Sequence, residues 1–455
     1  MKRLLSKVIA LAMSLTAAAS VFSGCGKGGD KVNKYVYTGP NDVQYMTFVI
    51  TNVYWENTES YLRKMKELHP DNKAGAKRMY AFGTPGPMLI TQSVEQIRDQ
   101  VNGSFAYAKQ YDIPVFFQLD DTTNYTTSFG DGAEIKYYEH PEMCEWTQFP
   151  DEGETYGGES AYGRLPKWYF NWGTEMAVEA VPNQASPQFR AFLKSQLEEG
   201  FIKPLIENLR ELQQEGREYL FAGCNIGWET QIPDYSSDSI LGSGVQMAES
   251  WERTQYGYGA LHSLGYDQKR LIKEADEADM LVDDYVKQLL FGVTHDFIEF
   301  IAKTIYDAGI PRHLIYSHQV SIGSSLKRYD TMAPPLWVAV NDYCTPGWTM
   351  SRVTCPWDQQ ELEATIAEHA PGLNEYVNAE GYCSGYRTEK EATEYIEQLL
   401  GGNCRNVTVF GYDNPNGTFG FRREPDFGFV VATNKWLNYE ICPDFDWNKR
   451  AEFKI

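Results

Sequence analysis

The stretch Ser93–Asp121, SVEQIRDQVNGSFAYAKQYDIPVFFQLDD, contains one complete helix–strand unit from which the fold is predicted. Its first part, Ser93–Gln110, predicts a helix, and the short apolar run Ile113–Leu119 predicts a buried strand. Two acidic residues, Asp120 and Asp121, come directly after this predicted strand. A helix that leads through a short turn into a buried apolar strand is typical of a parallel sheet covered by helices.

The same unit recurs along the chain. Further strands are predicted at Gln44–Asn52, Arg78–Phe82, Tyr219–Ile226, His313–His318, Leu336–Asn341, Asn374–Ala379 and Asn406–Tyr412. Helices are predicted near Glu59–Leu68, Ser186–Glu215, Gln268–Ala308, Asp358–His369, Glu389–Leu400 and Phe427–Tyr439. Eight strands that alternate with helices predict a closed (β/α)₈ TIM barrel, with an open two-lobed α/β sheet as the alternative. No glycine-rich dinucleotide or Walker motif follows a strand.

The length of 455 residues exceeds the roughly 250 of a simple barrel. The excess is expected in two long loops. The first follows the third strand, over roughly Asp120–Ala185, and the second follows the fourth strand and runs to about Asp267. These loops follow the carboxyl ends of strands, which is where barrels place variable functional loops. We therefore expect residues 41–455 to form one enlarged barrel domain.

The amino terminus is typical of an export signal. A basic start precedes the apolar run Val8–Val21, which is too short to span a membrane comfortably. Phe22-Ser-Gly-Cys25 resembles a bacterial lipobox, in which a Cys is lipidated and becomes the new amino terminus. We expect residues 1–24 to be a signal peptide and 25–40 a lipidated Cys25 with a flexible tether, which implies an extracytoplasmic lipoprotein on the bacterial cell membrane. An ordinary signal peptide, cleaved nearby, is the alternative.

The composition excludes some classes of partner. The chain has 62 acidic and 41 basic residues, a formal charge of −21. This charge argues against nucleic acid and against electrostatic docking on anionic lipid. The aromatic content of 14% suits ligands with flat apolar faces, of which sugars are the leading example. The alternative is that the acidity serves only solubility.

The cysteines and histidines favour neither a disulfide scaffold nor a metal centre. Without Cys25 an odd number of cysteines remains: Cys144, Cys224, Cys344, Cys355, Cys383, Cys404 and Cys442. Their pairing stays open. The chain has no CxxC and no HExxH motif, so we expect no metal and no cofactor.

Polar and aromatic side chains follow most of the predicted strands. In a barrel these positions surround the ligand. Beside Gln118 and Asn378, the candidate substrate-binding residues are Trp55, Asp120, Asp121, Asn225, Trp228, His318, Asn341, Asp342, Tyr343, Trp348, Tyr382, Tyr412 and Asp413.

Two carboxylates stand out as candidate catalytic residues. Glu229 follows the fourth strand and Glu380 follows the seventh, so their side chains are expected to face each other across the barrel mouth. Glycoside hydrolysis needs such a pair, about 5 Å apart for retention and about 6.5–9.5 Å apart for inversion. The alternatives are solvated surface carboxylates, with Asp120 and Asp342 in reserve.

This arrangement resembles the large clan A of barrel glycoside hydrolases, over most of the chain in order of elements but on few residues. The resemblance implies that Glu229 is the acid/base, that Glu380 is the nucleophile and that the mechanism is retaining. Trp228 stands where the clan usually has Asn, and Tyr412 matches the clan's usual aromatic after the eighth strand. We expect a raised pKa at Glu229 beside Trp228, and hydrogen bonds, with Tyr343 as a candidate donor, that keep Glu380 ionised.

The sequence thus predicts an exported glycoside hydrolase that cleaves a β-linked poly- or oligosaccharide. A two-lobed solute-binding lipoprotein for carbohydrate is the first alternative, and a barrel that binds glycans without hydrolysis is the second. The sequence leaves open the specific family, the sugar, its linkage, endo or exo action and the oligomeric state.

Overall fold

The structure is a computed structural model that describes residues 35–50, 55–121, 132–149, 169–171, 174–176, 180–232, 255–320, 334–350, 358–382, 388–410 and 428–443. Residues 36–455 form one compact unit, and residues 1–35 are assigned to another. The predicted signal peptide, Cys25 and the first part of the tether lie outside the described residues.

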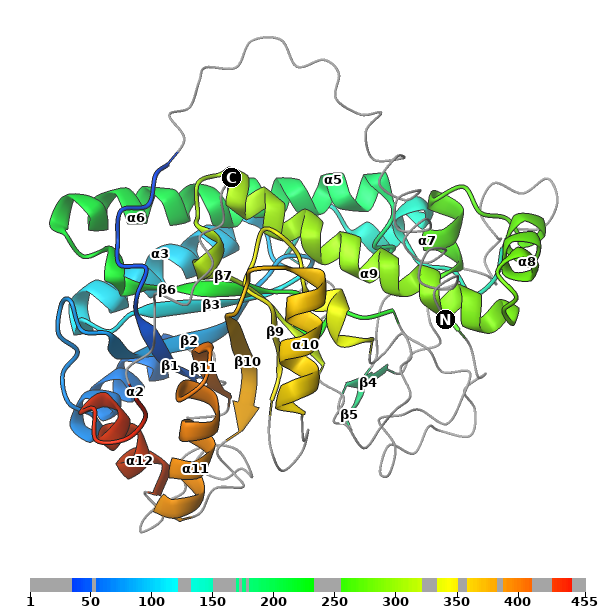
Figure 1. The fold of residues 1–455 in the computed structure, drawn as a ribbon. Helices are drawn as coiled ribbons and strands as arrows, with labels where there is room; N and C mark the ends of the chain where they lie inside the picture. The colour runs from blue at the N-terminus through cyan, green and yellow to red at the C-terminus, as the bar shows by residue number, and fades with distance from the viewer. Residues whose placement is uncertain are drawn as a thin grey trace. The chain divides into compact units, whose positions relative to one another are not determined.

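A parallel sheet forms the centre of the unit (Figure 1). Its strands are β1 (Gln44–Val49), β2 (Arg78–Met88), β3 (Val115–Asp120), β6 (Phe221–Ile226), β7 (Ile315–Ser317), β8 (Gln319–Val320), β9 (Gly347–Thr349), β10 (Tyr376–Tyr382) and β11 (Cys404–Phe410). They pair in the order β7-β6-β3-β2-β1-β11-β10-β9-β8, and every neighbour is parallel. Their side chains are nearly all buried, as expected for strands covered on both faces.

The two ends of this strand order belong to one stretch of chain. Only His318 separates β7 from β8, so the sheet returns to its own first strand. The Ser317 amide donates to the Thr345 carbonyl at 3.1 Å, and the Thr345 amide donates to the Ile315 carbonyl at 2.8 Å. These bonds close the seam beside β9. The described strands therefore form the predicted (β/α)₈ barrel and not the open two-lobed sheet.

Helices surround the strands (Figure 1). They are α2 (Trp55–Leu68), α3 (Val94–Tyr111), α5 (Pro187–Ser195), α6 (Lys203–Glu215), α7 (Tyr258–Ser263), α8 (Gln268–Glu277), α9 (Val282–Asp307), α10 (Gln359–His369), α11 (Glu389–Leu400) and α12 (Gly428–Leu437). A π-helical segment, Gln196–Ile202, joins α5 to α6. The predicted start at Ser186-Pro187 is confirmed, because the Ser186 hydroxyl caps α5 by accepting from the Phe189 amide.

The sixth predicted strand is wrong. Leu336–Asn341 contains a 3₁₀ helix, Leu336–Ala339, and the sixth strand is β9, Gly347–Thr349. A short apolar run cannot be assigned by periodicity alone, and β9 is too short to show any. The first residue of β9 must be glycine, because a Cβ at Gly347 would lie 2.3 Å from the Ser317 carbonyl oxygen and 2.4 Å from a methyl of Val377.

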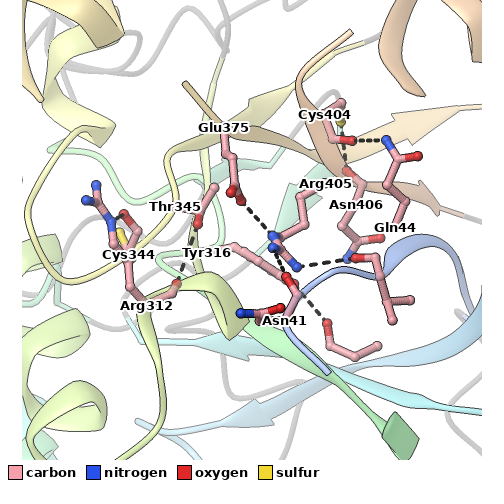
Figure 2. Close-up of polar contacts among 12 residues, drawn as sticks. Asn41, Gln44, Arg312, Tyr316, Cys344, Thr345, Glu375, Cys404, Arg405 and Asn406 are labelled. Atoms are coloured by element: carbon pink, nitrogen blue, oxygen red, sulfur yellow. Dashed lines mark hydrogen bonds and ion pairs between the residues drawn. The ribbon is translucent and has the colours of Figure 1, made fainter. Parts of the chain in front are cut away.

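The amino-terminal ends of three strands meet around a buried guanidinium (Figure 2). Arg405 of β11 donates to Glu375 at 2.7 Å, just before β10, and to the Asn41 carbonyl at 2.6 Å, just before β1. A third bond reaches the Val43 carbonyl at 3.3 Å. Arg405 is 1% exposed and Glu375 5%. This pair closes the end of the barrel opposite the candidate site.

The long segment after the third strand docks onto α7, a helix that the sequence did not predict. Glu145 is fully buried, and one of its oxygens accepts from the amides of Trp146 at 3.1 Å and Ala260 at 2.9 Å. Burial raises the pKa of Glu145 to about 7. In the same long segment, β4 (Tyr169–Asn171) and β5 (Thr174–Met176) pair as an antiparallel ribbon.

Among the described cysteines, Cys224, Cys344, Cys404 and Cys442 are free thiols. Among the described residues, none of the helices has the length and apolar character needed to cross a membrane.

Candidate functional site

The carboxyl ends of five neighbouring strands, with β7 and β8 counted as one, bring buried polar side chains together. Gln118 and Asp120 come from β3, Asn225 from β6, and His318 from the break between β7 and β8. Thr349 ends β9, and Glu380 lies in the last part of β10. This end of a barrel carries the functional site in essentially every characterised enzyme of the fold.

A tight turn after β6 places Glu229. Gly227 and Glu229 both have positive φ, of 72° and 55°, and the Thr230 amide donates to the Gly227 carbonyl. Asp121 holds the turn, because its two oxygens accept from the Gly227 amide at 2.7 Å and from the Thr230 hydroxyl at 2.8 Å. A left-handed conformation is uncommon for a glutamate and persists where the surroundings enforce it. Asp121 therefore shapes the site through the turn that carries Glu229.

The Glu229 carboxyl is buried against β9. Its Oε1 accepts from the Thr349 hydroxyl at 2.5 Å, and its amide donates to the His318 carbonyl at 3.1 Å. The His318 ring lies behind Thr349, with Nε2 3.0 Å from Oγ1 of Thr349 and 3.9 Å from Oε1 of Glu229. Its Nδ1 lies 3.3 Å from Nδ2 of Asn225. Burial lowers the pKa of His318 to about 3, so this imidazole is neutral at physiological pH.

Glu380 receives two side-chain donors. The Trp228 indole donates to Oε2 of Glu380 at 3.2 Å, and the Gln118 amide donates to the same oxygen at 3.4 Å. The Trp228 ring also contacts Phe410 at the end of β11, with ring centroids 6.0 Å apart. Donors to a carboxylate favour its ionised form.

Two shared neighbours bring Glu229 and Glu380 into one site. Trp228 precedes Glu229 in the chain and donates to Glu380. Thr349 is the register partner of Glu380 across β9 and β10 and donates to Glu229. Glu229 and Glu380 therefore lie at the same end of the barrel. Two buried carboxyl groups with different partners can divide acid and base roles.

Asn341, Asp342 and Tyr343 do not belong to this site. They precede β9 and therefore lie at its amino-terminal end, where Arg312 donates to the Asn341 carbonyl at 2.8 Å. The Asn341 side chain accepts from the amides of Tyr343 and Cys344, and the Tyr343 ring contacts Tyr306 of α9. The expected hydrogen bond from Tyr343 to Glu380 is wrong, and Trp228 and Gln118 occupy that role.

Trp348 is also misplaced by the sequence prediction. It is a predicted substrate-binding residue, but it lies inside β9 and is fully buried. Trp55 is the first residue of α2, and Tyr382 is the last of β10, but their side chains lie outside the described part. Tyr412 and Asp413 lie wholly outside it.

Thr349 is the site residue that sequence reasoning missed. Its contact with Glu229 depends on the position of β9, and the strand had been placed before Asn341. The signal in the sequence is slight: Pro346-Gly347 precedes only Trp348 and Thr349. Within the described residues, no group of three or more His, Cys, Asp or Glu side chains is arranged to hold a metal ion.

Comparisons with known proteins add little to this geometry. No protein-family model matches the chain. No curated protein matches its sequence either. Among solved structures, the chain is similar to D-psicose 3-epimerase crystallised in the presence of D-fructose, with a TM-score of 0.35 and 10% sequence identity. That match covers 87% of this chain and 98% of the epimerase.

Proposed function

We propose that this chain is a retaining glycoside hydrolase that acts on a β-linked poly- or oligosaccharide outside the cytoplasm. The single observation that carries the proposal is the convergence of Glu229 and Glu380, two buried carboxyl groups, at the carboxyl end of the barrel. Hydrolysis of a glycosidic bond requires two carboxyl groups on either side of the scissile bond.

In this mechanism Glu380 is the nucleophile and Glu229 the acid/base. The Glu380 carboxylate attacks the anomeric carbon while Glu229 gives its proton to the leaving oxygen, and a glycosyl-enzyme forms. Glu229, now ionised, then takes a proton from water, which attacks the same carbon and releases Glu380. The indole and amide donors on Glu380 support the nucleophile role because they favour its ionised form.

The surrounding residues fit a polar ligand. Trp228 offers an aromatic ring beside the carboxyls, and Asp120 ends the neighbouring strand. Aromatic faces stack on the C–H faces of sugars, and carboxylates accept from sugar hydroxyls. His318 and Asn225 are fully buried behind Thr349, so we assign them to the support of Glu229 rather than to sugar contact.

Aryl β-glycosides and a panel of glycans, incubated with residues 26–455, test the proposal. We expect E380Q to lower kcat/KM by roughly 10³-fold or more on every substrate, and E229Q by roughly 10²–10⁴-fold on glycans with poor leaving groups. E229Q should lose much less on aryl glycosides whose leaving group needs no proton. The matched control is D342N, an exposed carboxylate at the opposite end of the barrel, which should keep wild-type rates.

Wild-type rates in E229Q or E380Q would remove that residue from the mechanism. No hydrolysis of any substrate, together with tight saccharide binding, would instead favour a carbohydrate-binding barrel without hydrolytic activity. Proton NMR of the first-formed product distinguishes retention from inversion.

The proposed location has its own test. We propose that Cys25 carries the lipid that anchors the protein to the bacterial cell membrane. Metabolic labelling with a fatty-acid probe should label the exported wild-type chain and leave the C25A variant unlabelled. Equal labelling of both chains would contradict the lipid anchor without touching the proposed activity.

A further inference from the structure

A chain of four side chains leads from inside the barrel to one oxygen of Glu229. Asn225, His318, Thr349 and Glu229 come from β6, the β7–β8 break, β9 and the turn after β6. Successive polar atoms lie 3.3, 3.0 and 2.5 Å apart. None of the four is more than 3% exposed. We call these four residues the Glu229 relay.

The donors and acceptors of the relay can be ordered. A neutral imidazole carries one N–H, and Asn225 presents its Nδ2 donor to Nδ1 of His318. With Nδ2 of Asn225 as the donor to Nδ1, the hydrogen of His318 lies on Nε2, from which it is donated to Oγ1 of Thr349. The Thr349 hydroxyl has a single hydrogen, which is left for Oε1 of Glu229.

We propose that Asn225, His318 and Thr349 are positioning residues that hold Oε1 of Glu229 as a permanent hydrogen-bond acceptor, so that Glu229 gives and takes its catalytic proton on Oε2. The inference rests on the proposed function for its catalytic consequence. A carboxylic acid carries its proton on one oxygen only, and the oxygen that already accepts from Thr349 is the disfavoured place for it. The relay thereby selects one oxygen for proton transfer and fixes the plane of the carboxyl group.

The neutrality of His318 is part of the device. Because burial keeps the imidazole uncharged, it does not compete with Glu229 for a proton during the reaction. Three other carboxyl groups of the described residues lie near the turn. Asp121 is held by the Gly227 amide and the Thr230 hydroxyl, Glu380 is held by Trp228 and Gln118, and Asp120 lies at the end of β3.

The same three polar residues also have the order of a Thr–His–Asn nucleophile set. That arrangement requires Nε2 of the histidine to accept the hydroxyl proton. Here the Asn225 donor leaves the hydrogen on Nε2, and the Thr349 hydroxyl points its own hydrogen to a carboxyl oxygen. The geometry favours the positioning role.

The tautomer of His318 tests the relay directly. The full exported chain, labelled with ¹⁵N in its histidines, is measured by long-range ¹H–¹⁵N NMR between pH 5 and 8, with the H318Q variant used to assign the ring. We expect a neutral ring with hydrogen on Nε2 throughout this range. Hydrogen on Nδ1, or a doubly protonated ring, would overturn the proposal.

The titration of Glu229 is the second test. With ¹³C in the glutamate carboxyls and E229Q used for assignment, T349V should raise the pKa of Glu229 by about one unit, since it removes a donor to the ionised form. T349S keeps the hydroxyl and should keep the titration of Glu229 near its wild-type position. An unchanged titration in T349V would overturn the proposal.

The two proposals fail separately. If Glu229 is the catalytic acid, the alkaline limb of the kcat/KM profile of T349V moves upward together with its NMR titration. If no glycan is hydrolysed, the proposed function is refuted, and the tautomer and the carboxyl titration still decide whether the relay exists. A shifted NMR titration with an unmoved alkaline limb would refute the role of Glu229 as acid.

Discussion

The buried pair of Arg405 and Glu375 offers the clearest test of what holds the barrel together. In E375Q the shape of the side chain remains, but Arg405 loses the only carboxylate among its described hydrogen-bond acceptors. Removal of one partner of a buried ion pair costs about 3–5 kcal/mol, because the other charge stays buried. Glutamine still offers one acceptor, so we expect the lower value, about 3 kcal/mol.

The size of the unit converts this value into a temperature. An unfolding entropy of about 2.1 cal/mol/K per residue gives a total unfolding entropy of roughly 0.9 kcal/mol/K for residues 36–455. The Tm of E375Q should therefore fall by roughly 3 °C, measured by scanning calorimetry at pH 7. The matched control is E199Q, which breaks the half-exposed pair with Arg98 at 2.9 Å and should change Tm by less than about 1 °C.

A double variant separates the ion pair from the packing. Replacement of both charges, in E375L/R405M, should cost less than E375Q alone, because no uncompensated charge is left. A Tm for E375Q within about 1 °C of the wild type, or a double variant much less stable than E375Q, would refute the reasoning. Activity should change little in E375Q below its Tm, since the pair lies at the end opposite the candidate site.

Three further predictions concern other parts of the chain. Because the pKa of Glu145 is raised, the folded state holds this proton more tightly than the unfolded state, so its contribution to the free energy of unfolding is greatest below about pH 4.5 and is lost as pH rises toward 7. The E145Q variant should lose up to about 3 kcal/mol of this pH dependence. Equal slopes of Tm against pH for the wild type and E145Q would contradict this expectation. G347A should destabilise the protein strongly, because the new Cβ would overlap the Ser317 carbonyl and Val377. G402A is the matched control and should have a mild effect, because the nearest atom to its Cβ would lie at 3.4 Å. Similar thermal unfolding curves for the two variants would show that the chain is not closely packed around Gly347. W228F keeps an aromatic ring beside Phe410 but removes the hydrogen-bond donor to Glu380. It should lower kcat/KM by roughly 10-fold and raise the pKa of the acidic limb of the pH profile of kcat/KM. An acidic limb at the wild-type pH would argue against this hydrogen bond during the proposed reaction.

Most barrel strands were predictable because they are short apolar runs between helices with clear periodicity. The predicted helix at Ser93–Gln110 is α3, Val94–Tyr111, and its start carries a reciprocal cap between Ser93 and Gln96. The predicted strand Ile113–Leu119 is β3, Val115–Asp120. Both elements bury a face that the sequence pattern reports directly.

The sixth strand was not predictable on the same ground. β9 has three residues, and its pairing depends on the close approach of Gly347 to the Ser317 carbonyl, which is a tertiary contact. The apolar run Leu336–Ala339 has a stronger local pattern but forms a 3₁₀ helix. Asn341, Asp342 and Tyr343 were therefore assigned to the wrong end of the barrel, and Thr349 was missed.

The two glutamates could be selected from sequence because each follows a well-predicted strand. Their partners could not. The contact of Trp228 with Glu380 joins residues far apart in the chain, and the order of hydrogens through His318 depends on burial and on the orientation of Asn225. Such features follow from the assembled barrel rather than from any local stretch.

The strand that closes the barrel is interrupted by a residue that supports the candidate acid. Ser317 and Thr345 form the seam, and His318, the next residue, stands behind Thr349. The closure of the barrel and the support of the proposed acid therefore depend on two consecutive residues, Ser317 and His318. On slow heating, catalytic turnover should therefore decline before far-UV circular dichroism shows any loss of helix. The loss of turnover would then report the opening of the barrel between β7 and β9.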